Sequence, residues 1–295
     1  MSFFSKASDL FKRVLTDISP ELNIRVVYRM KKKKRLNLTN PQTFDEKLVY
    51  LRVTDYNHNP LVRELSDKYA VRDYVKQKGY SQTLNELYAV YDDPKQIVYE
   101  ELPRQFALKL NVGCGSNYIC SDKSKTDAAQ IGKITRRWMK KKPWRLYAEM
   151  QYKGVDKKIL SEKYLGSLDE PVPPDYKIYC FHGKPMAVLY IGGRFSGRTK
   201  AGFFDREWNY LGIKDNEKKH YINFETNDLP SKPKSLDLMF TVAEKLSDGF
   251  PFVRVDFFEA NGNAIFGEMT FSPAGGYDAA EVDINGKSMA EYLNV

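Results

Sequence analysis

Two apolar segments between residues 252 and 270 carry charged residues where buried strands normally have none. Residues two apart in a β-strand face the same side, so Arg254 should project beside Asp256, and Glu268 beside Thr270. The Asn-Gly pair between the segments favours a tight hairpin that brings the two pairs close together. Neighbouring carboxylates repel unless a cation lies between them, and Mg²⁺ prefers such oxygen ligands together with substrate phosphates. Arg254 is suited to hold a transferring phosphoryl group through its planar guanidinium.

An ordinary surface hairpin with solvated charges is the alternative interpretation of this segment. The apolar residues around the charges, and the FSPAGG stretch that follows at 271–276, favour a functional site instead.

A second group of candidate residues lies in FALKLNVGCGSNYIC, at 106–120. Lys109 points to one face of a predicted strand, and the glycines after it leave backbone N–H groups able to approach phosphate oxygens. The stretch lacks the Lys-Ser/Thr ending of a P-loop and the spacing of a dinucleotide-binding fingerprint, which argues against both. The candidate phosphate-binding residues of the loop are Gly113, Gly115, Ser116 and Asn117.

A third group fits the recognition of a nucleoside. Adenine needs hydrogen-bonding groups between apolar walls, and the end of the predicted strand ILSEKYLG offers them at Glu162, Lys163, Tyr164 and Leu165. Asp175, ten residues further on, is a candidate acceptor for the ribose hydroxyls. Lys68 and Lys177 are candidate phosphate contacts, although a single lysine is more often a solvated charge.

The elements that must position these residues change in type along the chain. Up to about residue 80, Ser-Pro and Asn-Pro starts precede amphipathic periods, which predicts helices. Alternating apolar residues and glycine turns then predict a mixed α/β region. We expect strands at 106–113 and 157–166, hairpins at 176–193 and 252–270, and helices at 126–142 and 235–250.

Composition limits the classes of function. With 295 residues, 42% of them apolar, the chain can bury a substantial core, which excludes a disordered protein. The net charge of +9 favours polyanionic partners such as nucleotides, nucleic acid, acidic polysaccharide or an anionic membrane. Cys114, Cys120 and Cys180 form no CxxC pair, so neither a disulfide framework nor a zinc site is indicated, and a reduced, cytoplasmic setting is expected.

The N-terminal segment MSFFSKASDLFKRVL has charges between its apolar residues and lacks the apolar run of a signal peptide. Its spacing predicts an amphipathic helix, which either packs on the domain, the interpretation favoured here, or touches a membrane peripherally. The KKKKR run at 31–35 is either a phosphate-binding site or a solvated helix end.

Six ordered segments together resemble the ATP-grasp superfamily, and within it the family related to the teichuronopeptide-biosynthesis protein TupA from bacterial polysaccharide gene clusters. They are NPQTFDEKLVYLR, SDKYAVRDYV, ELPRQFALKLNVGCGS, SEKYLG, DYKIYCFHGKP and VRVDFFEANGNAIFGEMTFSPAGG. The resemblance implies an α+β, ATP-grasp fold, with two α+β lobes that sandwich ATP and a helical region before them. It divides the chain into a helical region at 1–62, a small lobe at 63–105, a first ATP-grasp lobe at 106–160 and a second lobe with the metal site at 161–295.

The resemblance also implies roles for single residues. Lys109 would contact the α-phosphate, Arg254 would stabilise the transferring phosphoryl group, and Asp256 and Glu268 would hold one or two Mg²⁺. Thr270 stands where the superfamily usually has an asparagine metal ligand, which puts the second Mg²⁺ in question. The remaining roles fall to Lys68 before the nucleotide site, the loop 113–117 over the triphosphate, 162–165 at adenine, Asp175 at ribose, and Lys177 and Lys200 at phosphates.

By resemblance the protein is an ATP- and Mg²⁺-dependent carboxylate-amine ligase that forms an acyl phosphate. It would couple an amino acid or amine to a sugar-acid carboxyl in capsular or cell-surface polysaccharide biosynthesis, with no nucleic-acid partner. Arg194, Arg198 and Lys200 could clamp the acidic sugar, or belong to a mobile loop with solvated charges. The alternatives are a sugar-directed transferase, either a kinase or a glycosyltransferase, and a non-catalytic polyanion-binding module.

Overall fold

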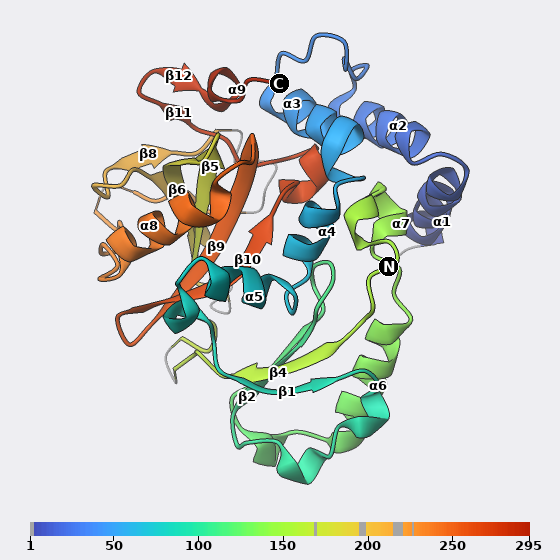
Figure 1. Ribbon diagram of the computed structural model, residues 1–295, viewed down its shortest axis with the longest axis vertical. Helices are drawn as coiled ribbons and strands as arrows, with labels where there is room; N and C mark the ends of the chain where they lie inside the picture. The colour runs from blue at the N-terminus through green and yellow to red at the C-terminus, as the bar shows by residue number, and fades with distance from the viewer. Residues whose placement is uncertain (1–2, 168–169, 195–198, 215–220, 226) are drawn as a thin grey trace. The chain divides into compact units, whose positions relative to one another are not determined.

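The computed structural model describes residues 3–167, 170–194, 199–214, 221–225 and 227–295, so that Arg198 lies outside the described residues. The chain forms two compact units (Figure 1). Unit 1 consists of Met1–Ala70, Glu86–Tyr164 and Ala274–Tyr277. Unit 2 consists of Val71–Asn85, Leu165–Pro273 and Asp278–Val295.

Three helices of unit 1 begin at residues whose side chains cap them. The Ser19 hydroxyl accepts a hydrogen bond from the Leu22 N–H, and Thr43 and Glu46 form a reciprocal capping box. Asn59 caps the next helix, with proline in its first turn. The predicted helices before residue 80 are thus confirmed, the last of them, α5 (Val71–Gln77), in unit 2. Those of unit 1 are α1 (Phe3–Ile18), α2 (Pro20–Lys32), α3 (Phe44–Leu51), α4 (Pro60–Ser66), α6 (Ala128–Met139) and α7 (Trp144–Tyr147).

The sheet of unit 1 is antiparallel, in the order β1-β4-β2-β3. Phe106, Leu108 and Leu110 alternate along β2 and pack with Ile131 and Trp138 of α6 in one core, which leaves the other face of β2 for its remaining residues. The strands at 106 and 159 and the helix α6 were predicted, whereas β1 and β3 were not. The strands are β1 (Leu87–Tyr91), β2 (Phe106–Leu110), β3 (Asn117–Cys120) and β4 (Ile159–Lys163).

Unit 2 contains a six-stranded antiparallel sheet in the order β10-β9-β5-β6-β7-β8. Helix α8 (Leu236–Ser247) packs on β5, β6 and β9 (Figure 1). The two predicted hairpins and α8 are confirmed, but the segment expected as a loop after β6 contains β7. The strands are β5 (Asp175–Phe181), β6 (Lys184–Gly192), β7 (Lys200–Phe204), β8 (Tyr210–Gly212), β9 (Phe252–Ala260) and β10 (Asn263–Thr270). The chain ends with β11 (Asp283–Ile284), β12 (Lys287–Ser288) and α9 (Met289–Tyr292).

A one-residue bulge at Gly267 determines which face of the sheet the end of β10 presents. Phe266 lies opposite Phe257, and their rings pack edge to face at 6.1 Å. After the bulge, Glu268 lies opposite Asp256. Without the extra residue, Phe266 and Glu268 would share one face, because residues two apart in a strand do so. The bulge therefore buries Phe266 on the face that carries Phe257 and turns Glu268 to the opposite face.

A buried arginine connects distant segments of unit 1. Arg52 is fully buried, and its guanidinium donates hydrogen bonds to the carbonyl oxygens of Gly275, Tyr147 and, at 3.1 Å, Ala148. Its central carbon lies 5.3 Å from the ring centre of Tyr277. Arg52 thereby ties the short segment 274–277 to helices that precede it by more than a hundred residues in the chain.

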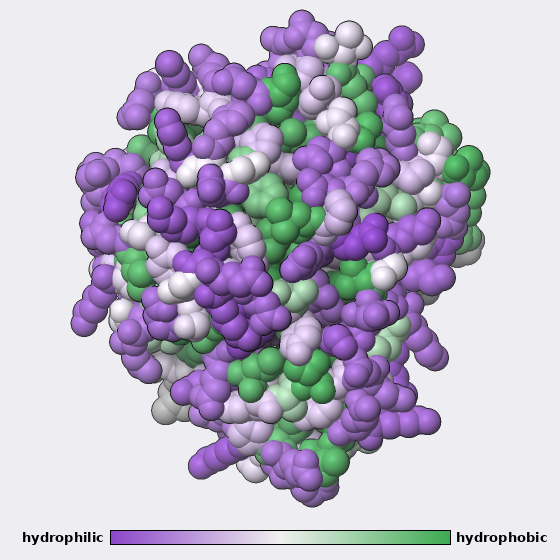
Figure 2. Space-filling view, viewed as in Figure 1, coloured by the Kyte–Doolittle hydropathy of each residue, from purple (hydrophilic) through white to green (hydrophobic). Residues whose placement is uncertain are grey.

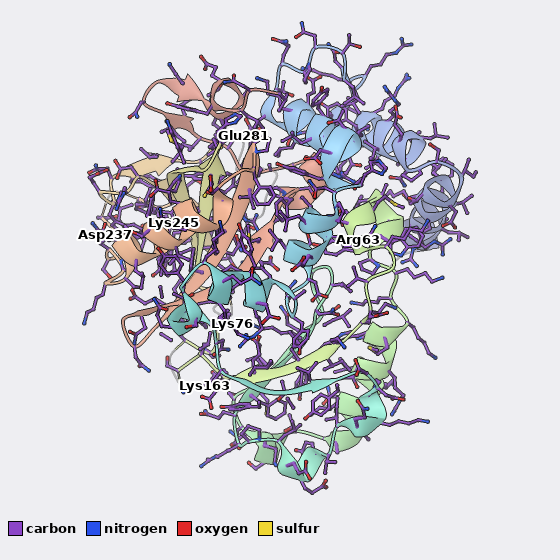
Figure 3. All side chains as sticks on the ribbon, in the orientation of Figure 1. Arg63, Lys76, Lys163, Asp237, Lys245 and Glu281 are labelled. Carbon is purple, nitrogen blue, oxygen red and sulfur yellow. The ribbon has the colours of Figure 1, made fainter. Side chains whose placement is uncertain are left out.

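We expect Arg52→Met to lower the free energy of unfolding by about 3 kcal/mol, because three carbonyls, two of them fully buried, lose their donor at about 1 kcal/mol each. Arg63→Met is the matched control, since Arg63 is exposed on α4 (Figure 3), and it should change stability by less than about 0.5 kcal/mol. Urea unfolding followed by fluorescence measures both. Equal losses in the two variants would contradict the anchoring role of Arg52.

We also expect Gly267→Val to destabilise unit 2 by about 1–3 kcal/mol, because a Cβ at this position lies only 3.1 Å from the Asp256 carbonyl oxygen. Deletion of Gly267 is the sharper comparison. It removes the extra residue but keeps Glu268 opposite Asp256, so it should cost less than valine. Unfolding midpoints rank the variants. If the deletion lowers the midpoint more than valine does, the stability of unit 2 depends on the bulge itself and not on the face to which Glu268 points.

Candidate functional site

Charged side chains gather on the face of the unit 2 sheet that lies opposite α8. Lys177 on β5 is paired in register with Asp256 on β9, and both are at least nine-tenths buried. The Lys177 Nζ lies 2.5 Å from Asp256 Oδ2 and 3.2 Å from Asp175 Oδ1. Cys180 lies three positions after Lys177 on β5 and therefore on the other face of the sheet, where it contacts the Ala243 carbonyl of α8. The alternation of β5 therefore separates a charged face from the apolar face under α8.

Arg254 and Asp256 form a two-point ion pair along one strand, as their spacing predicts. The Arg254 Nε donates to Asp256 Oδ1 at 2.7 Å, and its Nη2 donates to Oδ2 at 2.8 Å. Burial lowers the pKa of Arg254, but the neighbouring Asp256 charge outweighs burial and leaves that pKa raised. Arg254 is therefore a permanent cation.

Thr270 and Glu268 continue this network from the partner strand. The Arg254 Nη2 donates to the Thr270 hydroxyl at 3.2 Å. The Thr270 hydroxyl in turn donates to Glu268 Oε1 at 3.4 Å. Glu268 lies directly opposite Asp256, a position in which Cβ atoms are about 4.5–5.5 Å apart. The hairpin thus brings the pair Arg254 and Asp256 next to the pair Glu268 and Thr270, as the sequence predicted.

Of the other residues predicted for this site, the structure brings Arg194 into the network but not Lys200. The Arg194 Nη2 lies 2.5 Å from Asp175 Oδ2, so Asp175 is held by two cations. Lys200, at the start of β7, pairs with Asp228, and its Nζ lies 5.9 Å from the Phe224 ring centre. Its neighbour Ala201 is in register with Ile191, which is in register with Asp175, so Lys200 belongs to the opposite face.

The donor set fits a hard divalent cation with few protein ligands. No group of three or more His, Cys, Asp or Glu residues with metal-binding geometry occurs among the described residues. Mg²⁺ commonly uses only one or two carboxylates and completes its shell with water and phosphate oxygens. Asp256 and Glu268 provide that number, and the Thr270 hydroxyl, bonded to Arg254 and Glu268, is a weaker neutral donor.

In unit 1, Lys109 and Glu162 form an ion pair on the face of the sheet away from the core shared with α6. Lys109 is in register with Leu160, and Glu162 with Ala107, so the two charges are diagonal neighbours. The Lys109 Nζ lies 2.7 Å from Glu162 Oε2, and both side chains are mostly buried. Two residues predicted for different parts of a nucleotide site, phosphate and adenine, are therefore in direct contact.

The glycine loop after β2 is closed by backbone and side-chain contacts. The Leu110 N–H donates to the Ser116 carbonyl at 2.9 Å, and Asn117 begins β3 opposite Lys109. The Lys68 Nζ donates to the Gly113 carbonyl at 2.9 Å, so this predicted phosphate contact lies at the loop. Gly113 and Gly115 both have positive φ, and a Cβ at Gly113 would come within 2.8 Å of Pro143.

Three residues that the sequence did not single out support this loop. The Asn111 side-chain amide donates to Asp67 Oδ2 at 2.9 Å, which joins the end of β2 to the turn carrying Lys68. Burial raises the pKa of Asp67 above its ordinary value. The Lys141 Nζ donates to the Ser116 hydroxyl at 2.7 Å. Only the position of Asn111, directly after a buried strand, gives a signal in the sequence.

The predicted adenine-binding segment lies where the chain passes from unit 1 to unit 2, between Tyr164 and Leu165. Glu162 is buried, whereas Lys163 is exposed at the end of β4 (Figure 3). The Lys163 N–H donates to the Glu86 carbonyl at 2.9 Å, which extends the pairing of β4 with β1. Tyr164 and Leu165 are both partly buried.

The described helices include none with the length and apolar character that a bilayer crossing requires. This finding concerns the described helices only.

Comparison with solved structures gives low similarity. An ATP-grasp ligase PsnB complexed with minimal precursor has 13% identity and a TM-score of 0.43, and the match covers 84% of this chain and 66% of that one. D-alanine–D-alanine ligase from Bacillus anthracis complexed with ATP has 15% identity and a TM-score of 0.40, over 71% and 56% of the chains. That from Helicobacter pylori has 12% identity and a TM-score of 0.39, over 73% and 56%. The chain spans less than two thirds of the length of each of these structures.

The comparison with curated proteins gave no match. In contrast, the sequence matches the TupA-like ATP-grasp family over residues 46–289, which confirms the predicted ATP-grasp fold. Because this match covers far more than half of the chain, the protein belongs to the TupA-like ATP-grasp family.

Proposed function

We propose that the protein is a Mg²⁺- and ATP-dependent ligase that joins a carboxylate to an amine through an acyl phosphate. Membership of the TupA-like ATP-grasp family supports the reaction class. The observation that carries the proposal is the buried cluster in which Lys177 and Arg254 hold Asp256 opposite Glu268. It combines carboxylates for a cation with fixed positive charges for phosphoryl oxygens, the two requirements of phosphoryl transfer.

Each charged group has a role that its chemistry allows. When bound, Mg-ATP would supply the electrophilic γ-phosphoryl group. Asp256 and Glu268 would hold the cation, and Arg254, charged at every accessible pH, would stabilise the charge on the transferring group. Lys177 would orient Asp256 and contact phosphate oxygens, while Asp175, positioned by Arg194, would accept the ribose hydroxyls.

The unit 1 groups would bind the rest of the nucleotide. Lys109, kept in place by Glu162, and Lys68 at the glycine loop would contact phosphates, and residues 162–165 would bind adenine. No cysteine or histidine takes part in the described charged cluster of unit 2. The groups there position and neutralise rather than attack, and a covalent protein intermediate is not required.

For the substrates, we propose a sugar-acid carboxyl of a bacterial surface polysaccharide precursor and an amino acid or amine. Membership of the TupA-like ATP-grasp family supports an anionic glycan substrate.

We expect Glu268→Gln to lower turnover of Mg-ATP by roughly a hundredfold or more, because a neutral amide binds Mg²⁺ more weakly than a carboxylate. Asp256→Asn should do the same and also destabilise the protein by about 3–5 kcal/mol, since it leaves two buried cations without their partner. Asp283→Asn, which changes an exposed carboxylate paired with Lys214, is the control and should leave turnover unchanged. Coupled assays of ADP release, with melting curves, measure these effects. Normal turnover in Glu268→Gln would refute the assigned metal site.

The reaction class has its own test. With the wild-type protein, Mg-ATP and a panel of uronic acids and amino acids, ADP and inorganic phosphate should appear only when carboxylate and amine are both present. Hydroxylamine in place of the amine should trap the acyl phosphate as a hydroxamate. A product that retains the phosphate would identify a kinase instead, and binding of anionic glycan with no dependence on Mg-ATP would identify a binding module.

A further inference from the structure

Helix α1 packs on the rest of unit 1 through a largely polar face. Leu15 and Thr16 are buried, and the Thr16 hydroxyl donates to the Arg145 carbonyl at 2.7 Å. On the same face, the Lys12 carbonyl accepts a hydrogen bond from the Asn23 side chain of α2 at 2.6 Å. The expected packing of this helix on the domain is therefore observed, but its polar side makes the contacts.

The opposite face of α1 exposes a stripe of large apolar side chains. Leu10, Phe11, Val14 and Ile18 are 63%, 50%, 45% and 71% exposed, at the spacing that places them along one side of a helix. Figure 2 shows apolar atoms gathered over α1 at the right edge of the view. A helix on the surface of a globular protein normally turns its apolar stripe to the core, whereas α1 turns its stripe to solvent. Leu22 and Met30 on α2, 42% and 44% exposed, add to the apolar surface.

This apolar surface belongs to the most basic part of the sequence. Residues 1–35 contain ten Lys or Arg and three acidic residues, so they contribute +7 of the net charge of +9. Each of the three acids is paired with a cation: Asp9 with Lys12, Asp17 with Arg145, and Glu21 with Arg25. Exposed basic residues beside the stripe and along α2 are Arg13, Arg29, Lys33, Lys34 and Arg35.

The family match begins at residue 46, so α1 and α2 lie outside the matched residues. We propose that these two helices form a docking surface for a membrane rich in anionic lipid. Helix α1 lies in the interface with its apolar stripe among the acyl chains, and the basic residues contact the lipid headgroups. The combination of both features selects this partner. Nucleic acid would leave the apolar stripe without a partner, and a second copy of the chain would bring two strongly positive surfaces together.

The test uses the full chain and sedimentation with lipid vesicles. We expect binding to vesicles of phosphatidylcholine mixed with phosphatidylglycerol, weak binding to phosphatidylcholine alone, and loss of binding as salt rises. The combined variant Phe11→Ser, Val14→Ser and Ile18→Ser should weaken binding at least tenfold, as should Arg29→Gln with Lys33→Gln and Lys34→Gln. The control, Leu61→Ser with Val98→Ser, changes apolar residues of similar exposure elsewhere in unit 1 and should bind normally.

Circular dichroism checks that each variant folds, which the high exposure of the changed side chains favours. The proposal is overturned if wild-type protein ignores anionic vesicles, or if the serine variant binds them as well as the control does. Sedimentation velocity without lipid distinguishes another occupant: a wild-type dimer that the serine variant loses would identify a second copy. Binding to RNA that depends on the basic residues but not on the apolar stripe would identify nucleic acid.

Discussion

The burial of Asp256 is the constraint on which the rest of unit 2 depends. An ionised carboxylate removed from water costs several kcal/mol unless cations and hydrogen bonds replace the solvent. Here both oxygens are occupied, one by Arg254 and the other by Arg254 and Lys177. Lys177 comes from β5 and Arg254 from β9, so the pairing of these two strands brings both cationic partners to Asp256. The same neighbours reduce its repulsion with Glu268, which lies directly opposite.

The sequence was sufficient to predict local geometry in this site but not the register that completes it. Alternation along a strand placed Arg254 with Asp256, and Glu268 with Thr270. Yet the Asn-Gly turn pairs Ala260 with Asn263, and continuing that register would set Glu268 opposite Val255, on the face covered by α8. Only the bulge brings it opposite Asp256. A single glycine inside an apolar strand can mark a bulge or a close backbone approach, and nothing local decides between these.

In unit 1, too, the sequence predicted local structure but not the contacts between distant residues. The strand carrying Lys109 and the glycine turn after it follow from residue types over a few positions. The contact of Asn111 with Asp67 joins residues 44 positions apart, and that of Lys141 with Ser116 spans 25. Polar side chains give no periodic signal, so such long-range supports could not be read from the sequence. The sequence also could not show that Lys200 points away from the charged cluster, because its orientation depends on how β7 pairs with β6.

Thr270 bears on how many cations the proposed site would hold. The superfamily's asparagine would offer a carbonyl oxygen to a second ion. The threonine hydroxyl instead accepts from Arg254 and lies as a donor toward Glu268, so it connects the cation of the cluster with the carboxylate on the neighbouring strand. A neutral hydroxyl is a poorer ligand than an amide carbonyl, whereas two carboxylates with phosphate oxygens and water suffice for one Mg²⁺. In the proposed site this arrangement would favour a single cation, and Arg254 would supply the second positive charge at the phosphoryl group.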